Sequence, residues 1–351
     1  MEPMKILIVT DAWHPQINGV VRTYEHLIAE LEKSGHTIRV IGPADFPYTV
    51  PLPGYREIRL AVAPYRRLAA MIDAFAPGTI HIATEGPLGW AARRYCLNNN
   101  LAFTTCYHSH FPDYLAQRAA SFLPPSYNAV HTATKNYVRN FHAPSRALMV
   151  ATQSLEDELK NWDFQTPMVR LTRGVDLSLF SPGEKTLFHD LPGPIALYVG
   201  RIAIEKNIED FLVMEWSGSK VVVGKGPLRA ALEKKYPHVH FVGPKQNTDL
   251  AAHYRSADVF VFPSRTDTFG MVQIEALACG LPVAAYNVRG PKDIITEGFL
   301  GALDSDISRA TQKALKSSEK AQRSAYIRQY YNWETAAGQF LKAMIPTKQS
   351  K

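Results

Sequence analysis

Short apolar runs alternate with segments of helical periodicity from the start of the chain. The run Lys5–Thr10 is apolar almost throughout, and a helical pattern follows from about Val20 to Ser34, closed by Gly35. Similar runs recur and are predicted to be strands: Thr37–Gly42, Thr79–Ala83, Ala102–Tyr107 and Ala147–Ala151. Apolar runs separated by helices are typical of a parallel, doubly wound α/β sheet.

The same alternation starts again after a polar stretch. Residues 177–194 are rich in Pro and Gly and are predicted to be a linker. The strands predicted after it are Ile195–Gly200, Lys220–Gly224, His240–Gly243, Asp258–Pro263 and Pro282–Tyr286. We therefore expect two doubly wound, Rossmann-like domains, 1–176 and 195–332, facing each other across a ligand cleft. The pattern leaves open which domain the last helix, 333–351, packs against.

Length and composition agree with two domains. The chain has 351 residues, 46% of them hydrophobic, which is enough for two cores of ordinary size. Its three cysteines, Cys96, Cys106 and Cys279, suggest neither a disulfide framework nor a metal site. We expect reduced thiols in a cytoplasmic protein. The chain opens on a predicted strand rather than a signal peptide, and no apolar run has the length of a membrane span.

The formal net charge is +7, and its distribution is uneven. Between Asp73 and Glu156 the only acidic residues are Glu85 and Asp113, whereas this stretch contains Arg93, Arg94, Arg118, Lys135, Arg139 and Arg146. Such a segment favours an anionic partner: a phosphate-bearing substrate, a nucleic acid or an acidic membrane surface. No nucleic-acid recognition motif accompanies the charge, so we expect no nucleic-acid partner.

Two glycine-containing motifs follow the first strands of the second half. In Val199–Asn207, Arg201 and Lys206 lie between a strand and a helix, where two cations suit a diphosphate. A solvated surface loop is the alternative. In Val221–Leu228, the sequence Gly-Lys-Gly-Pro permits close approach of a ligand, but it equally suits a tight structural turn. It lacks the third glycine and the downstream acid of a dinucleotide-binding fingerprint.

The third motif, Pro263–Gly280, carries more chemistry. A strand ends at Pro263, Asp267 follows in a loop, and a helix is predicted to begin near Phe269. The free amides and positive dipole end of that helix suit a phosphate, and Glu275 lies about one and a half turns further in. Alternatively, Asp267 caps the helix and Glu275 is a solvated helical residue.

Taken in order, these motifs resemble the retaining glycosyltransferases of family 4, which have the GT-B fold. The sequences Pro15–Val20, Tyr107–Pro112 and Arg173–Asp176 also fit, and they resemble the branch of sulfoquinovosyl, mannosyl and diacylglycerol glycosyltransferases. The resemblance covers almost the whole chain. It implies a hexosyltransferase that uses a nucleoside diphosphate sugar, for which we expect a UDP-hexose such as UDP-glucose, with GDP-mannose as the alternative.

The resemblance also implies roles at matching positions. Arg201 and Lys206 match a diphosphate-binding pair, Glu275 the acid that holds the donor ribose, and His108 a histidine near the transferred sugar. Gly19 matches a loop that closes over the diphosphate. The turn whose amides face the donor comprises Phe269, Gly270, Met271 and Val272. Two positions depart from the family: Asp267 replaces a Glu and is one methylene shorter, and Asn18 replaces a Gly beside Gly19.

The expected mechanism stabilises the leaving diphosphate with fixed cations and a helix terminus, so we expect no cofactor and no metal. Arg201, Lys206, His108 and Asp267 are the candidate catalytic residues. A triplet that resembles a metal-binding signature, Asp304-Ser-Asp306, precedes the amphipathic stretch Ile307–Leu315. Helix capping explains that triplet better than metal binding.

The acceptor is expected to bind the N-terminal domain. Pro64–Phe75 mixes basic, aromatic and apolar residues at helical spacing, and Ser121–Tyr127 adds apolar groups beside the basic segment. Such surfaces bind anionic bilayers, which predicts a lipid acceptor and peripheral association with the inner face of the membrane. The alternatives are apolar residues that face the domain core, a glycan acceptor, and a nucleotide-sugar-binding protein without transfer activity.

Overall fold

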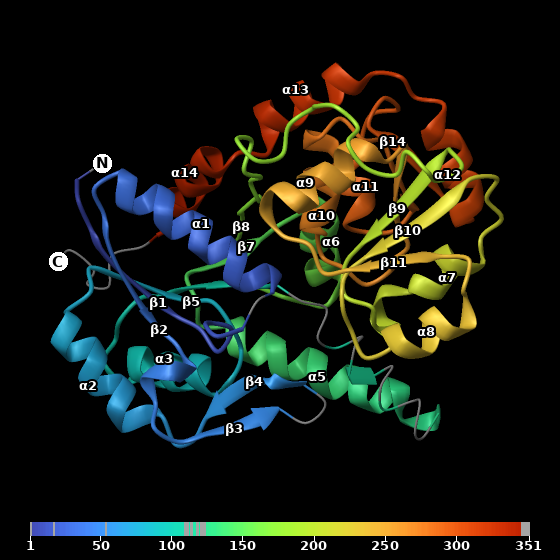
Figure 1. Ribbon diagram of the computed structural model, residues 1–351. Coiled ribbons are helices and arrows are strands. Elements are labelled where there is room, and N and C mark those ends of the chain that lie inside the picture. Colours follow the sequence, from blue (N-terminus) through green and yellow to red (C-terminus); the bar gives the residue numbers. More distant parts are fainter. Residues whose placement is uncertain are drawn as a thin grey trace. The chain divides into compact units, whose positions relative to one another are not determined.

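The computed structural model describes residues 2–344 except 17, 53–54, 109–111, 113–114, 117–118 and 120–123. The chain folds into two compact units. Unit 1 comprises residues 1–173 and the segment that begins at Trp333, and unit 2 comprises residues 174–332. Each unit contains a six-stranded parallel sheet with helices packed on it, which confirms the two doubly wound sheets expected from the apolar runs (Figure 1).

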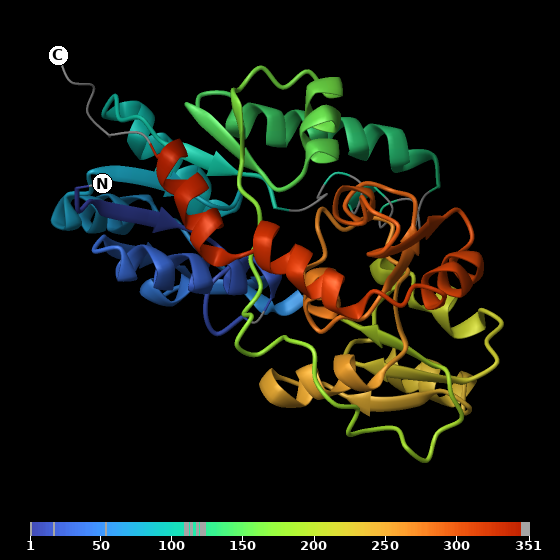
Figure 2. The same ribbon diagram turned by 90° about the horizontal axis from the view of Figure 1, so that it is seen from above.

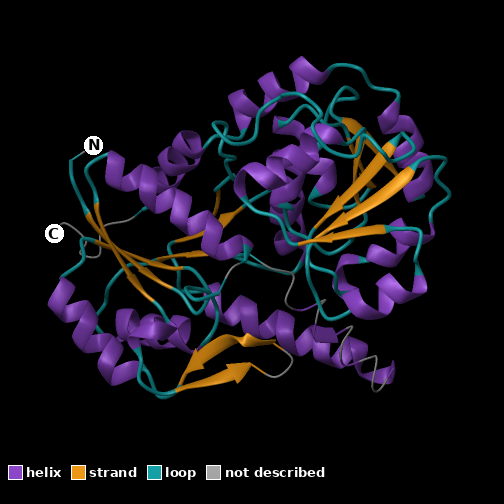
Figure 3. Cartoon of the chain, viewed as in Figure 1, coloured by secondary structure: helices purple, strands orange, loops and turns teal. Residues whose placement is uncertain are grey.

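The sheet of unit 1 has the strand order β2-β1-β5-β6-β7-β8. Its strands are β1 (Lys5–Val9), β2 (Thr37–Ile41), β5 (Thr79–Ile82), β6 (Thr104–Cys106), β7 (Ala147–Val150) and β8 (Met168–Arg170). Its helices are α1 (Gly19–Lys33), α2 (Tyr65–Phe75), α3 (Pro87–Asn98), α5 (Tyr127–His142), α6 (Gln153–Asn161) and α14 (Trp333–Ala343), with the 3₁₀ turns η1 (Pro43–Asp45) and η2 (Pro124–Ser126). An antiparallel hairpin, β3 (Thr49–Leu52) and β4 (Tyr55–Ala61), stands outside this sheet (Figure 3).

Strand β1 shows why its apolar run is unbroken. Alternate side chains of a strand point to opposite faces of a sheet, and here helices cover both faces. Leu7 and Val9 pack in a core with α2 and α3. Ile6 and Ile8 pack in a second core with residues of α1 and α14. The last helix therefore packs on unit 1, and Figure 2 shows α14 in red beside the blue α1.

The sheet of unit 2 has the order β11-β10-β9-β12-β13-β14. Its strands are β9 (Ile195–Val199), β10 (Ser219–Val223), β11 (His240–Gly243), β12 (Val259–Phe262), β13 (Val283–Tyr286) and β14 (Gly301–Asp304). Its helices are α7 (Ile208–Val213), α8 (Arg229–Lys235), α9 (Asn247–Ser256), α10 (Met271–Ala278), α11 (Pro291–Ile294), α12 (Ile307–Leu315) and α13 (Lys320–Tyr330), with the 3₁₀ turn η3 (Ile204–Lys206). The order reverses between β9 and β12, and ligands bind open α/β sheets at such a point.

The polar segment 177–194, predicted to be a linker, belongs to unit 2 and is hydrogen-bonded to it at several positions. The Arg255 guanidinium donates to the carbonyls of Leu179 and Ser181, and the Ser256 hydroxyl accepts from the amides of Thr186 and Leu187. Within the described residues, no helix combines the length and apolar character needed to cross a bilayer.

Candidate functional site

The residues of the first and third motifs meet at the carboxyl ends of β9 and β12. These two strands pair with each other, and the loops that follow them are joined by a hydrogen bond of 3.2 Å from Thr266 Oγ1 to the Glu205 carbonyl. The site thus lies where the strand order of unit 2 reverses. A doubly wound sheet leaves a crevice at this position because the following helices lie on opposite faces.

Lys206 and Asp267 form an ion pair between these two loops. The Lys206 ammonium lies 2.5 Å from Asp267 Oδ1, and the two side chains are only 27% and 22% exposed. Arg201 lies on the same loop, with Nε 4.0 Å from a carboxylate oxygen of Glu205. The buried Tyr198 donates its hydroxyl to the Arg201 carbonyl at 2.7 Å and so fixes the backbone there. Lys206 and Asp267 are thus in direct contact, and Arg201 lies on the same loop as Lys206, while the roles assigned to all three residues stay predictions.

The Gly-Lys-Gly-Pro loop packs against the loop that follows β9 and contains Arg201. A Cβ atom at Gly224, where φ is +148°, would lie 1.9 Å from the Gly200 carbonyl oxygen, and one at Gly226 would lie 2.1 Å from that of Ile202. Backbone hydrogen bonds join the two loops, among them Ile202 N to Lys225 O at 2.9 Å. These glycines are therefore required by close packing of backbone on backbone, which is the structural-turn alternative. Helix α8 begins at Arg229, after this turn.

Helix α10 begins at Met271, two residues later than predicted. Its N-cap is Gly270 with φ +83°, a left-handed conformation that favours glycine. No side chain caps this end, so Asp267 is not a helix cap, and that alternative is wrong. The amides of Met271 and Val272 belong to the first turn. Phe269 is buried, and its carbonyl accepts a hydrogen bond from Gln273 Nε2 at 2.7 Å.

Glu275 is buried, not solvated, so the alternative of a solvated helical residue is also wrong. It is 5% exposed, and Oε2 accepts a hydrogen bond of 2.9 Å from the hydroxyl of Tyr254 on α9. A buried carboxylate is costly unless it is hydrogen-bonded. Tyr254 thus orients this acid, a role that the sequence motifs did not indicate because α9 contributes no motif residue.

In unit 1, the loop after β1 is ordered by a buried carboxylate. Asp11 accepts hydrogen bonds from the amides of Leu88 and Gly89 at the start of α3. Its backbone carbonyl accepts from the Gln16 side chain, whose own oxygen accepts from Asn18. Burial raises the pKa of Asp11 to about 6, opposed by the amide hydrogen bonds. The loop geometry therefore depends on a group that titrates near neutral pH.

Asn18 and Gly19 open helix α1. Asn18 is the N-cap, and its side-chain oxygen accepts from the amides of Val20 and Val21, each at 3.0 Å. A Cβ atom at Gly19 would meet nothing within 4 Å, so packing within the chain does not require a glycine there. The role assigned to Gly19 by resemblance stays a prediction. Ile17 of the same motif lies outside the described residues.

His108 follows β6, and both of its ring nitrogens are hydrogen-bonded. Nδ1 lies 3.1 Å from Arg173 Nη2, and Nε2 lies 2.9 Å from the hydroxyl of Tyr24 on α1. Burial and the charge of Arg173 hold the pKa of His108 well below its ordinary value, so the imidazole is neutral. Sequence reasoning noted Arg173 only within a motif and did not single out Tyr24. Residues 109–111 of the Tyr107–Pro112 motif lie outside the described residues.

Helix α2 turns its apolar side to the core of unit 1, where Leu68 and Ile72 are buried. The expectation that this apolar side faces a bilayer is therefore wrong, and the core-facing alternative holds. A cavity of about 400 Å³ nevertheless opens beside it, lined by Tyr65, Trp90, Ala91, Arg93, Arg94, Leu97 and Asn98. Arg93 and Arg94 stack over the rings of Trp90 and Tyr65. Residues 121–123 of the other proposed membrane segment lie outside the described residues.

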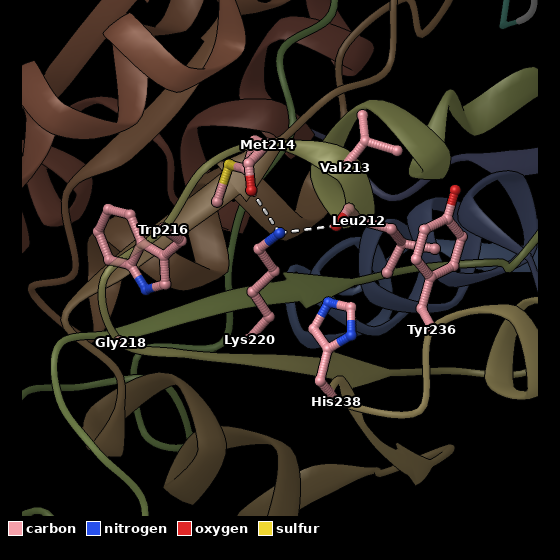
Figure 4. A pocket seen from close by; sticks show the side chains of 8 residues that line it. All are labelled: Leu212, Val213, Met214, Trp216, Gly218, Lys220, Tyr236 and His238. Carbon is pink, nitrogen blue, oxygen red and sulfur yellow. Dashed lines mark hydrogen bonds between the residues drawn. The ribbon is translucent and has the colours of Figure 1, made fainter.

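A second cavity, of about 440 Å³, lies at the opposite end of β10 from the candidate site (Figure 4). Its lining includes Trp216, Tyr236 and His238, and the buried Lys220 extends into it. The Lys220 ammonium donates to the carbonyls of Leu212 and Met214 at the end of α7. Cations stabilise helix carboxyl ends, so this lysine serves the helix terminus.

Among the described residues, no group of three or more His, Cys, Asp or Glu side chains is arranged to hold a metal ion. The triplet at 304–306 caps a helix, as predicted. Asp306 accepts from the amides of Ser308 and Arg309, and Asp304 pairs with Arg309 and Lys313.

Comparison with known proteins covers both units. Residues 17–179 match the family model described as Glycosyltransferase Family 4, and residues 184–329 match the model described as Glycosyl transferases group 1. The chain is 30% identical over 335 residues to a GDP-mannose-dependent alpha-mannosyltransferase of Mycolicibacterium smegmatis, covering 86% of this chain and 84% of that protein.

Two further relatives extend the comparison. An alpha-monoglucosyldiacylglycerol synthase of Streptococcus pneumoniae is 25% identical over 364 residues, which cover 89% of this chain and 78% of the synthase. A solved structure of sucrose-phosphate synthase from Thermosynechococcus elongatus has a TM-score of 0.76 at 21% identity, covering 97% and 98% of the two chains. That structural likeness supports the two-domain fold.

Proposed function

Because this chain belongs to glycosyltransferase family 4 and is a hexosyltransferase of GT-B fold, we propose that it transfers a hexose from a nucleoside diphosphate sugar to a membrane lipid such as diacylglycerol, with retention of anomeric configuration. The observation that carries this proposal is the cluster of Arg201, Lys206 and the uncapped start of α10 at the carboxyl ends of β9 and β12. This cluster combines two cations with free helix amides, the groups that bind a diphosphate.

In the proposed reaction, the bond between the anomeric carbon and the diphosphate oxygen breaks, and that carbon bonds to the acceptor hydroxyl oxygen. The leaving diphosphate keeps the electron pair and accepts the acceptor's proton. Lys206, Arg201 and the α10 amides stabilise the charge that develops on it. Glu275 holds the donor ribose, and His108 orients hydroxyls of the sugar. These side chains supply the positive charge, so the proposal requires no metal ion.

A UDP-hexose is the first candidate donor, since a glucosyldiacylglycerol synthase is among the relatives. GDP-mannose is the second, because the mannosyltransferase is 30% identical over most of both chains. A thermal-shift panel of UDP, GDP, UDP-hexoses and GDP-mannose separates them, because a ligand that binds only the folded state raises its apparent stability. A protein that none of these stabilises, and that hydrolyses none of the sugars, would contradict the proposal.

The lipid acceptor places the enzyme at the cytoplasmic face of a membrane. The surface around Tyr65, Trp90 and Leu97 supports this, since it joins apolar and aromatic groups to Arg93 and Arg94. Each basic residue near an anionic bilayer contributes about 1 kcal/mol to binding. We expect co-sedimentation with vesicles that contain anionic lipid, weakened by Arg94→Glu.

The matched control is Lys234→Glu on α8, which makes the same charge change in unit 2 rather than in unit 1. Protein that stays in the supernatant at low salt would exclude membrane association. Acceptor screening then compares diacylglycerol with oligosaccharides. Transfer only to the oligosaccharides would favour an envelope polysaccharide or another glycan as the acceptor.

A further inference from the structure

Two ion pairs of opposite direction join the chain after β9 to the chain after β12. In the first pair, the Lys206 ammonium, after β9, lies 2.5 Å from Asp267, after β12. In the second pair, Arg265 Nη2, after β12, lies 3.7 Å from Asp210 Oδ2 on helix α7, which follows the β9 loop. Each of the two connections thus contributes one cation and one acid.

The second pair is held by a tyrosine of the neighbouring strand. Tyr286 is the last residue of β13, which pairs with β12, and its side chain is buried. Its hydroxyl donates to Asp210 Oδ2 at 2.6 Å, and the central guanidinium carbon of Arg265 lies 3.5 Å from the centre of its ring. Burial, together with the hydrogen bond to Asp210, raises the pKa of Tyr286 to about 12, so its hydroxyl keeps its proton. An exposed ion pair contributes little by itself, whereas a guanidinium stacked on an aromatic ring is also held by cation–π attraction.

The β12 loop that carries Arg265 also sets the position of candidate site groups. The Thr266 hydroxyl donates to the Glu205 carbonyl at 3.2 Å. A Cβ atom at Gly290 would lie 2.6 Å from the Asp267 carbonyl oxygen, so the chain after β13 packs directly on this loop. The loop then leads into α10, which begins at Met271. A shift of the loop would therefore move both Asp267 and the start of α10.

The first pair weakens when a donor binds, because the proposed function brings the Lys206 ammonium to a diphosphate whose oxygens compete with Asp267 for its charge. The second pair uses neither of these side chains. We infer that Arg265, Asp210 and Tyr286 are positioning residues, forming a second link that keeps the two loops in place when a diphosphate competes for the ammonium of the first pair. This inference rests on the proposed function for that competition.

Hydrogen exchange tests the link without ligand or turnover. The amide of Asn207 bonds to the Ile204 carbonyl at 3.1 Å, so its exchange reports opening of the β9 loop. Arg265→Gln should raise its exchange rate about threefold or more. The fold-change should be larger in a Lys206→Ala background, where the first pair is already absent. An unchanged rate, or the same fold-change in both backgrounds, would overturn the inference.

Transfer kinetics test the positioning. Arg265→Gln should lower kcat about tenfold while KM for the donor changes by less than about threefold, because Lys206 and the start of α10 lose their fixed spacing. Arg265→Lys keeps the charge without the planar stack and should recover part of kcat. The control is Arg309→Gln, which removes the partner of Asp304 at the end of β14 and should change neither constant.

The two measurements separate this inference from the proposed function. If donor is turned over and folded Arg265→Gln has the kcat of Arg309→Gln, the positioning role is wrong while the proposed function stands. If no donor is turned over, the proposed function fails, and the exchange rates still decide whether the second pair holds the loops. Should Arg265→Gln not fold, Asp210→Asn tests the same link from α7: faster exchange at Asn207 supports it, and an unchanged rate refutes it.

Discussion

Replacing Lys206 with Ala removes the ammonium that is best placed to meet a leaving diphosphate. At about 4 Å and an effective dielectric constant of about 20, two unit charges attract by about 4 kcal/mol. The exposures of Lys206 and Asp267, 27% and 22%, place the site between surface and interior, where that dielectric applies. Loss of one preorganised donor typically costs about 3–4 kcal/mol of transition-state stabilisation. We therefore expect kcat to fall by two to three orders of magnitude.

The same substitution should also weaken donor binding, and this effect can be measured separately from the fall in kcat. Without the ammonium, the Asp267 carboxylate repels the incoming diphosphate, so KM for the donor should rise as well. The double variant Lys206→Ala with Asp267→Asn removes this repulsion and should recover KM but not kcat. Steady-state transfer assays with labelled donor measure both constants, and circular dichroism confirms folding.

Lys185 provides a matched control because it also forms an ion pair in unit 2, with Asp258. That aspartate lies at the start of β12, whereas the candidate site lies at its end. Lys185→Ala should leave kcat and KM unchanged. If folded Lys206→Ala turns over within about twofold of Lys185→Ala, the electrostatic role of Lys206 is wrong.

Three further predictions concern stability. Gly224→Ala should lower the free energy of unfolding by about 3 kcal/mol or more, seen as a lower Tm, because its methyl group would lie 1.9 Å from the Gly200 carbonyl; an unchanged Tm would show that the loops separate freely. The pKa of Asp11 is about 6 when folded and 3.8 when unfolded, so the native state binds more protons between these values. The free energy of unfolding of the wild-type protein, relative to that of Asp11→Asn, should fall by about 3 kcal/mol as the pH rises from 4 to 6.5. Urea titrations in which the two proteins show parallel pH profiles would contradict this. Lys220→Met should lower stability by about 1–3 kcal/mol with unchanged kcat, because the carbonyls ending α7 lose their donor; an equally stable variant would refute that role.

The sequence predicts the parallel strands well because strands buried on both faces need unbroken apolar runs. It does not predict β3, β4, β8 or β14. Strand β8 has only three residues, all partly exposed, and the hairpin contains Pro51 and polar positions, so neither has a clear apolar signature. Helix α10 starts two residues later than predicted because Gly270, not a side-chain cap, sets its beginning.

The candidate site is predictable where its residues follow one another in a motif, as Lys206 and Asp267 do after two adjacent strands. Their partners are not. Tyr254 on α9 and Tyr24 on α1 are tyrosines in ordinary amphipathic helices, and only the packing shows that their hydroxyls face Glu275 and His108. Long-range polar contacts of this kind leave no local pattern in a single sequence.

Because the chain returns to unit 1 after unit 2, the last helix of unit 1 is synthesised only after unit 2. Ribosomal synthesis finishes all of unit 2 before it reaches α14, whose Phe340 lies fully buried against the sheet of unit 1. Until α14 is synthesised, the apolar face of unit 1 that this helix covers stays exposed to solvent while unit 2 folds. A nascent chain stalled before Trp333 should therefore bind chaperones through this exposed apolar face. Synthesis of α14 should end that binding.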